Sequence, residues 1–262
     1  MGYSSNGFGA QGVEIYPDVA VLAQAAARHF ADLAMAAIAA RGRFAVALAG
    51  GATPKPMYAT LASDDFAKRV DWSRVHIFWG DERCVASDHP DSNYRMAREA
   101  LLDHVPIPAA NVNRLRGELE PAQTAIEYEQ VLRAFFAQTP AGKEGEKMPG
   151  ARFDLILLGM GGDGHTASLF PGTAAIGEQE RWVVAHYVQK LGAWRVTLTP
   201  AVINAAADVI FIVSGAGKSE RLRQVLTGPR NPAALPAQIV RPDPGHLLWL
   251  VDVAAGSWMG VG

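Results

Sequence analysis

The fold of this chain is decided by residues 153–165, Phe-Asp-Leu-Ile-Leu-Leu-Gly-Met-Gly-Gly-Asp-Gly-His. The first six residues form an apolar run with the length of a buried strand. Four glycines, Asp163 and His165 follow it directly. Open α/β sheets keep their chemistry at the carboxyl ends of their strands. The order therefore predicts an acid/base pair at such an end, in which the Asp163 carboxylate orients the His165 imidazole.

Two other interpretations of this segment are open. The glycine spacing over residues 159–164 matches the G-x-G-x-x-G pattern of dinucleotide-binding proteins. However, the match lies late in the chain, a long helix does not follow it, and the acidic residues at 178 and 180 precede the next strand instead of ending it. The segment can also be a structural turn with an incidental histidine, although four glycines beside Asp163 and His165 exceed what a turn requires.

The pattern along the chain predicts an α/β fold with a sheet covered on both faces. Apolar runs predict strands at 13–16, 43–48, 75–79, 153–158, 182–187, 194–198, 208–213 and 247–251. Helices are expected from Pro17 to Arg41, from Pro54, from Ser92 to about Leu102, and over 121–138, 200–206 and 217–226. We expect a loose tail at 1–12, one domain over 13–262, a polar loop at 80–92 and a surface loop at 139–150.

Composition excludes several classes of function. With 262 residues and a net charge of -2, the chain is typical of one globular domain and not of a general nucleic-acid binder. The single cysteine, Cys84, rules out an internal disulfide, and the seven histidines lack a metal-ligand spacing such as HExxH. Residues 1–12 do not resemble a signal peptide, and 20–40 are amphipathic. We therefore expect a cytoplasmic protein with no metal and no membrane partner.

Three more strand-end loops carry polar chemistry. Residues 49–54, Ala-Gly-Gly-Ala-Thr-Pro, place two glycine amides before a helix, an arrangement that binds phosphate, although a plain turn is the alternative. Residues 80–83, Gly-Asp-Glu-Arg, place charges at the exit of a buried strand, where they are either ion-paired or catalytic. Residues 214–219, Ser-Gly-Ala-Gly-Lys-Ser, contain the Gly-Lys-Ser with which a P-loop ends. However, the glycine that a P-loop needs five residues before Gly217 is Ile212 in this chain. Lys218 opposes the helix dipole there, which favours a bound anion.

Four segments together resemble the 6-phosphogluconolactonases, of the superfamily that includes glucosamine-6-phosphate deaminase. They are LAGGATPKPMYATLA, FWGDERCVASDHPDSNYRMAREALL, FDLILLGMGGDGHTASLFPGT and WRVTLTPAVINAAADVIFIVSGAGKSERLRQVL. The resemblance implies a three-layer α/β/α fold with a mostly parallel, modified Rossmann-like sheet. It also implies hydrolysis of 6-phospho-D-glucono-1,5-lactone in the pentose phosphate pathway, without a cofactor. Ala49 and Ala52 stand where the family often has serine, so backbone amides must replace hydroxyl contacts there.

Lactone hydrolysis needs a base that activates water and a group that stabilises the developing oxyanion. His165 fits the base, with Asp163 as its orienter. Arg83, held by Asp81, fits the stabiliser of the developing oxyanion or of the bound carboxyl product. The family positions matching His165 and Arg83 usually have these roles. Glu82 has no assigned role.

A remote phosphate also needs a binding site. Candidates are Lys218, Thr53 and the amides of Gly50 and Gly51, with Arg195 a weaker one. The partner is then a small sugar-phosphate lactone, and we expect a monomer or weak homodimer.

Two other functions are compatible with the sequence. Glucosamine-6-phosphate deaminases share the glycine loop and the Asp-Gly-His unit, but place a glutamate five residues after the histidine, where this chain has Phe170. A non-catalytic sugar-phosphate sensor is the second alternative. Such proteins usually carry a DNA-binding segment, for which this α/β pattern leaves no room.

Overall fold

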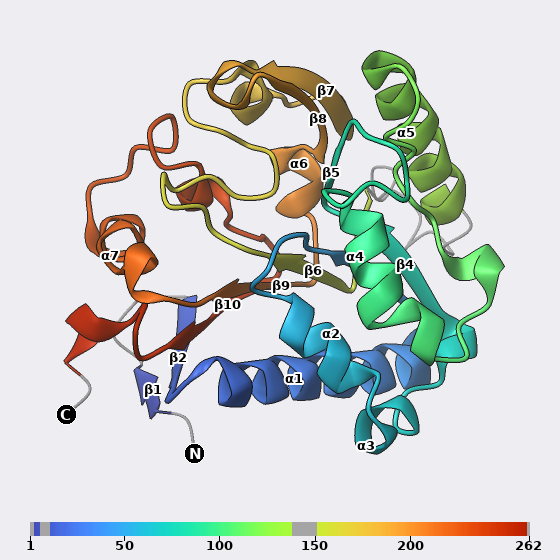
Figure 1. Cartoon of the computed structure of the whole chain (residues 1–262), viewed down its shortest axis with the longest axis horizontal. Coiled ribbons are helices and arrows are strands. Elements are labelled where there is room, and N and C mark those ends of the chain that lie inside the picture. The colour runs from blue at the N-terminus through green and yellow to red at the C-terminus, as the bar shows by residue number, and fades with distance from the viewer. Residues whose placement is uncertain (1–2, 6–10, 138–150, 261–262) are drawn as a thin grey trace.

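The computed structural model describes residues 3–5, 11–137 and 151–260, which form two sheets and their helices (Figure 1). The main sheet has seven strands in the spatial order β1-β2-β10-β9-β6-β3-β4. Their bounds are β1 Tyr3–Ser5, β2 Gln11–Tyr16, β10 His246–Asp252, β9 Asp208–Val213, β6 Leu155–Leu158, β3 Phe44–Leu48 and β4 Val75–Trp79. All neighbouring pairs are parallel except β1 with β2.

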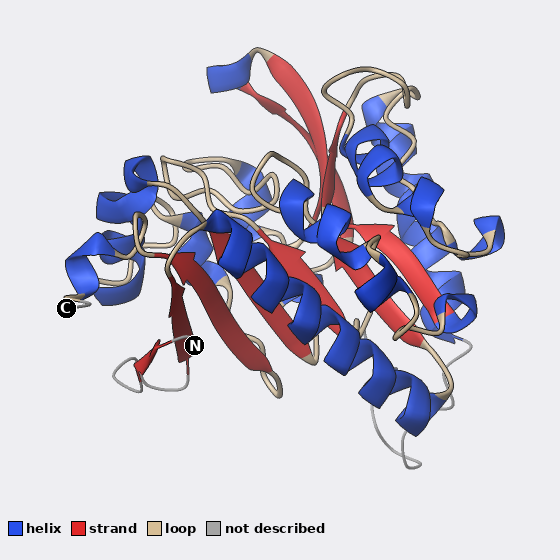
Figure 2. Ribbon diagram, turned by 60° about the horizontal axis from the view of Figure 1, so that its bottom comes forward, coloured by secondary structure: helices blue, strands red, loops and turns tan. Residues whose placement is uncertain are grey.

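The central strands β3 and β6 are buried at every residue, as expected for parallel strands covered on both faces. Helix α1 (Val19–Arg41) crosses one face of the sheet (Figure 2). It begins at Asp18, whose carboxylate accepts from two backbone amides, and ends at Gly42 in the left-handed conformation. The alanine-rich inner side of α1 therefore packs closely on the strands, and the predicted three-layer α/β/α class is confirmed.

The remaining helices are short, apart from one. They are α2 Lys55–Leu61, α3 Asp64–Ala67, α4 Asn93–Ala100, α5 Pro121–Ala137, α6 Pro200–Ile203 and α7 Ser219–Thr227. Ser92 caps α4 by accepting from the amide of Arg95, as the sequence predicted. Within the described ranges, no helix is long and apolar enough to cross a membrane.

A second, antiparallel sheet was not predicted. It consists of β5 (Asp81–Arg83), β8 (Ala193–Leu198) and β7 (Val183–Val188), and it rises from the main sheet beside α5 (Figure 2). The prediction of a loop over the whole of 80–92 is therefore wrong. Three charged residues give no apolar signal for a strand, yet β5 pairs with β8 and both Asp81 and Glu82 are buried.

The prediction of a loose tail is wrong at residues 3–5 and 11–12. Residues 3–5 form β1, which pairs with β2, and β2 begins at Gln11. The surface loop predicted at 139–150 lies outside the described residues.

Parallel pairing places the carboxyl ends of β4, β3, β6 and β9 along one edge of the sheet. The four polar loops that the sequence singled out follow these four strands. They meet at this edge, below the second sheet.

Candidate active site

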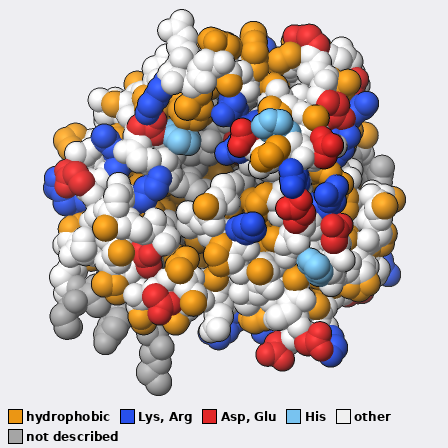
Figure 3. Space-filling model, viewed as in Figure 1, with side chains coloured by type: hydrophobic (Ala, Val, Ile, Leu, Met, Phe, Trp, Pro, Cys, Tyr) orange, Lys and Arg blue, Asp and Glu red, His pale blue; other side chains and the backbone are white. Residues whose placement is uncertain are grey.

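A cavity of about 380 Å³ lies where the four loops meet. The molecule is hollowed on the corresponding face, with Lys and Arg side chains on the rim (Figure 3). Seven of the nine predicted site residues line it, namely Gly50, Gly51, Thr53, Asp81, Arg83, His165 and Lys218. A second cavity of about 640 Å³ shares Asp81, Arg83 and His165 with it and adds the other two, Asp163 and Arg195. The fold thus brings all nine predicted residues to one connected region.

The predicted acid/base pair is formed. Nδ1 of His165 lies 2.5 Å from Oδ1 of Asp163, and the same oxygen accepts from the His165 amide at 3.2 Å. Because an ionised carboxylate only accepts, the contact requires the proton on Nδ1. Nε2 has no partner in the described part of the chain, so its lone pair is available to a molecule in the cavity.

Local backbone geometry explains why glycines surround this pair. A Cβ on Gly161 would lie 2.0 Å from Nδ1 of His165, so only glycine permits the close approach of the imidazole. Gly164 has a φ of +85°, which turns the chain between the two polar residues. On its far side, His165 stacks against the ring of Phe170 at a centroid distance of 4.1 Å. The imidazole is therefore fixed from both sides.

Lys190 is a site residue that the sequence analysis missed. It lies on the 3₁₀ turn η5 (Gln189–Leu191) between β7 and β8, and its Nζ donates to Oδ2 of Asp163 at 2.7 Å. Burial acts to raise the pKa of Asp163, but the hydrogen bonds from Lys190 and His165 outweigh it and hold that pKa well below the usual range. Asp163 is therefore an anion at neutral pH. The sequence held no signal for this contact, because Lys190 belongs to no motif.

The loop at 49–54 has the geometry of an anion site. The amides of Gly50 and Gly51 donate to no acceptor in the described residues, and Gly51 has a φ of +90°. A Cβ on Gly50 would lie 1.9 Å from Oδ1 of Asn93, so glycine lets the buried Asn93 side chain pack against the loop. Lys218, at the end of the 3₁₀ turn η6 (Ala216–Lys218), lines the same cavity without an ion pair among the described residues. This arrangement leaves donors unpaired beside the cavity.

Asp81 does not hold Arg83, which corrects one prediction. The Asp81 carboxylate accepts from the Ser168 hydroxyl at 2.7 Å and from Asn93 at 3.4 Å. Arg83 instead donates to the Asp91 carbonyl at 2.6 Å. Asp81 and Arg83 are two residues apart on β5, so their side chains point to the same face of the strand, and both line the cavities. Each of them nevertheless has its own hydrogen-bond partners.

Glu82, which had no assigned role, is structural. Its buried carboxylate accepts from the amides of Asn93 and Tyr94 at 2.7 and 2.8 Å and so caps the first turn of α4. Burial raises the pKa of Glu82 despite these bonds. Glu82 therefore connects β5 to α4 and does not face the cavities.

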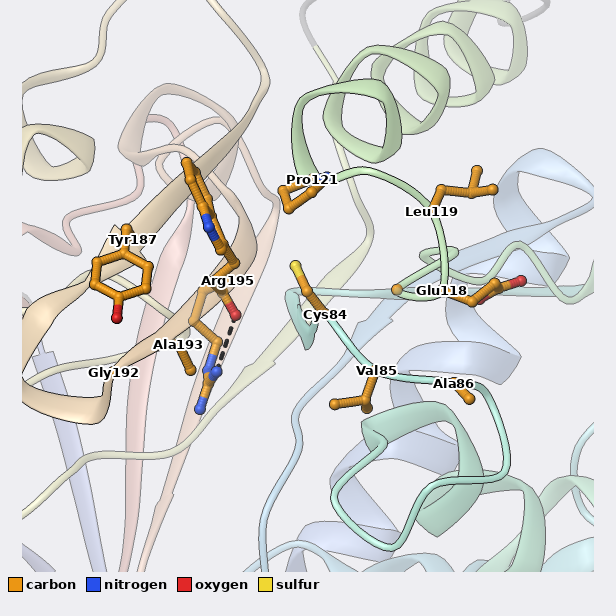
Figure 4. A pocket seen from close by; sticks show the side chains of 12 residues that line it. Cys84, Val85, Ala86, Glu118, Leu119, Pro121, Tyr187, Gly192, Ala193 and Arg195 are labelled. Atoms are coloured by element: carbon orange, nitrogen blue, oxygen red, sulfur yellow. Dashed lines mark hydrogen bonds between the residues drawn. The ribbon is translucent and has the colours of Figure 1, made fainter.

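Arg195 lies directly across the strand pair from Arg83. Burial lowers its pKa, and the charge of Arg83 acts in the same direction. Arg195 also borders a third cavity of about 600 Å³, between Cys84, Pro121 and Leu119 on one side and the β7–β8 hairpin on the other (Figure 4). Of the predicted site residues only Arg195 lines this third cavity, so we do not place the chemistry there.

A hydrogen-bonded carboxylate–imidazole pair, unpaired backbone donors and several cations around one cavity are what an α/β enzyme for a small anionic substrate requires. Within the described residues, no group of three or more His, Cys, Asp or Glu side chains has the arrangement of a metal site. Residues 17–249 match the family model of glucosamine-6-phosphate isomerases/6-phosphogluconolactonase. The chain belongs to this family.

Several relatives within the family are 6-phosphogluconolactonases. The chain is 43% identical over 250 residues to a 6-phosphogluconolactonase of Nostoc sp., covering 95% of this chain and 98% of that protein. It is 46% identical over 222 residues to a 6-phosphogluconolactonase of Synechocystis sp., covering 84% and 87%. The structure of 6-phosphogluconolactonase from Trypanosoma cruzi superposes with a TM-score of 0.83 at 27% identity, covering 97% and 98%.

Proposed function

We propose that the chain hydrolyses 6-phospho-D-glucono-1,5-lactone to 6-phospho-D-gluconate, the reaction that the names of its relatives indicate. The observation that carries the mechanism is the contact between His165 Nδ1 and Asp163, which leaves Nε2 free beside the cavity. In this proposal, Nε2 of His165 removes a proton from water as the water oxygen attacks the lactone carbonyl carbon.

The remaining steps follow from charge. Attack converts the carbonyl oxygen to an oxyanion, and the Arg83 guanidinium at the border of both cavities stabilises it. When the intermediate collapses, the bond from the carbonyl carbon to the ring oxygen breaks. The His165 imidazolium returns its proton to that ring oxygen, which becomes a hydroxyl group. Asp163 stabilises the imidazolium while it exists.

The phosphate of the substrate is assigned to the loop after β3. The unpaired amides of Gly50 and Gly51, the Thr53 hydroxyl and Lys218 line the 380 Å³ cavity and supply hydrogen-bond donors and a positive charge. Arg195 lines the adjoining cavity and not this one, which makes it a weaker phosphate ligand. Binding energy at the phosphate then positions the lactone carbonyl at His165.

The deaminase reaction fits the site less well. Opening an amino sugar and moving a proton between C1 and C2 needs an extra proton relay. Phe170 is buried and stacked on His165, and its ring cannot transfer a proton.

Single-domain organisation, a cytoplasmic location and a monomeric or weakly dimeric state stay predictions.

A coupled assay tests this function. Glucose-6-phosphate dehydrogenase makes the lactone, and the loss of lactone is compared with its spontaneous hydrolysis. We expect the purified chain to accelerate that loss. Equal rates with and without the chain would exclude the proposed reaction.

A further inference from the structure

The turn at the end of the β7–β8 hairpin contacts the loop after β6 through the Lys190 side chain. Lys190 lies on η5, at the turn of the β7–β8 hairpin, and reaches Oδ2 of Asp163 across 27 residues of sequence. The other carboxylate oxygen accepts from His165. The Lys190 side chain is 67% exposed, and the Asp163 side chain only 21%. The carboxylate is thus held between two donors from different parts of the fold.

We propose that Lys190 is a positioning residue for the His165 base, an inference that rests on the proposed hydrolase function. By holding Oδ2, it fixes the Asp163 carboxylate in the orientation in which Oδ1 accepts from Nδ1. That orientation keeps the proton on Nδ1 and the lone pair on Nε2.

The backbone around Asp163 explains why a distant tether is needed. Asp163 is flanked by Gly162 and Gly164, and a Cβ on Gly162 would meet no atom within 4 Å. Glycine has the largest backbone freedom of all residues, so the backbone on either side of Asp163 restrains its carboxylate little. Within the described residues of this loop, only His165 donates to the carboxylate, through Nδ1 and its amide, and both of these bonds go to Oδ1. Lys190 holds the opposite oxygen, Oδ2, from the turn of the β7–β8 hairpin.

Lys190 also contributes to the charge around the imidazole. The charged groups that line the two cavities with His165 are Arg83 and Asp81 of β5, Asp163 of its own loop, Lys190 of η5, Arg195 of β8, Lys218 of η6 and Arg221 of α7. Cations therefore outnumber carboxylates. Among these cations, Lys190 donates to Asp163, so removing it takes away the positive charge that holds Oδ2.

The first test compares three variants in the lactone assay. Lys190→Met keeps the length of the side chain without its charge, and Lys190→Arg keeps the charge. We expect Lys190→Met to lower kcat about tenfold, with little change in KM. This loss is a part of the roughly 10²- to 10⁴-fold rate enhancement that a general base contributes, because the base itself remains. Lys190→Arg should recover most of this loss. The control is Lys68→Met, which removes an exposed lysine paired with Asp64 away from the site and should leave kcat unchanged.

A double-mutant cycle separates positioning from direct contact with the substrate. If Lys190 acts through Asp163, Lys190→Met should have almost no further effect on kcat in an Asp163→Asn background. Equal effects of Lys190→Met in both backgrounds, or a raised KM at unchanged kcat, would overturn the inference. If the wild-type chain itself has no lactonase activity, the proposed function fails instead.

Discussion

The proposed chemistry depends on His165. Its Nδ1 is occupied by Asp163, its ring is stacked on Phe170, and its Nε2 has no partner in the described structure. An imidazole fixed in this way is ready to accept a proton from water without rearranging.

Replacing this base gives a direct prediction. His165→Ala should lower kcat by roughly 10²- to 10⁴-fold and leave KM much less changed, because the phosphate contacts remain. Steady-state kinetics on the phosphorylated lactone measure both quantities. A folded variant with nearly normal kcat would remove His165 from this role.

Single site residues were predictable where they belong to a recognisable sequence motif. Asp163 and His165 share one short segment, and their contact follows from their spacing. Lys190, Asn93 and Ser168 were missed because each reaches the site through tertiary pairing that leaves no local pattern. The same reason explains the one wrong contact. Sequence neighbours suggested that Asp81 holds Arg83, whereas its partners come from α4 and the loop after β6.

In the proposed function, the loop between β3 and α2 binds the substrate phosphate together with η6. Lys218→Ala should therefore lower kcat/KM for the phosphorylated lactone but hardly change the slow turnover of unphosphorylated gluconolactone. Inorganic phosphate should compete with the substrate for the same donors. Parallel measurements on the two lactones decide the matter. Equal losses on both would assign Lys218 to the fold or to the chemical step.

Helix α4 depends on a carboxylate from outside it. Glu82 accepts from the first amides of α4, so Glu82→Ala leaves buried donors without an acceptor and should reduce the free energy of unfolding by about 3 kcal/mol. Glu82→Gln, which keeps one acceptor oxygen, should lose less. Urea unfolding of the three proteins measures the difference. Unchanged stability of Glu82→Ala would mean that these amides find other acceptors.

The elements of the main sheet were largely predictable, and those of the second sheet were not. Strands such as β4 and β9 are mostly apolar, and their bounds agree with the sequence prediction. Both β7 and β8 were recognised as strands, but sequence alone could not say which sheet they join. The three residues of β5 are charged, so only their pairing with β8 makes them a strand.

At the scale of the whole molecule, two sheets meet around one active-site region. The main sheet supplies the four loops, and the second sheet supplies Arg83, Arg195 and Lys190. The same family includes isomerases that act on an amino sugar phosphate. We predict no ammonia release from glucosamine 6-phosphate above background, because Phe170 provides no second proton relay. A colorimetric ammonia assay checks this, and clear turnover would show that the reaction class is wrong.

The most direct test of the account is the initial rate at which freshly made 6-phospho-D-glucono-1,5-lactone disappears as the concentration of the purified chain is raised. The account predicts a rate that rises in proportion to the wild-type chain and stays near the spontaneous value with His165→Ala. A rate that remains at the spontaneous value for every concentration of the folded wild-type chain would contradict it.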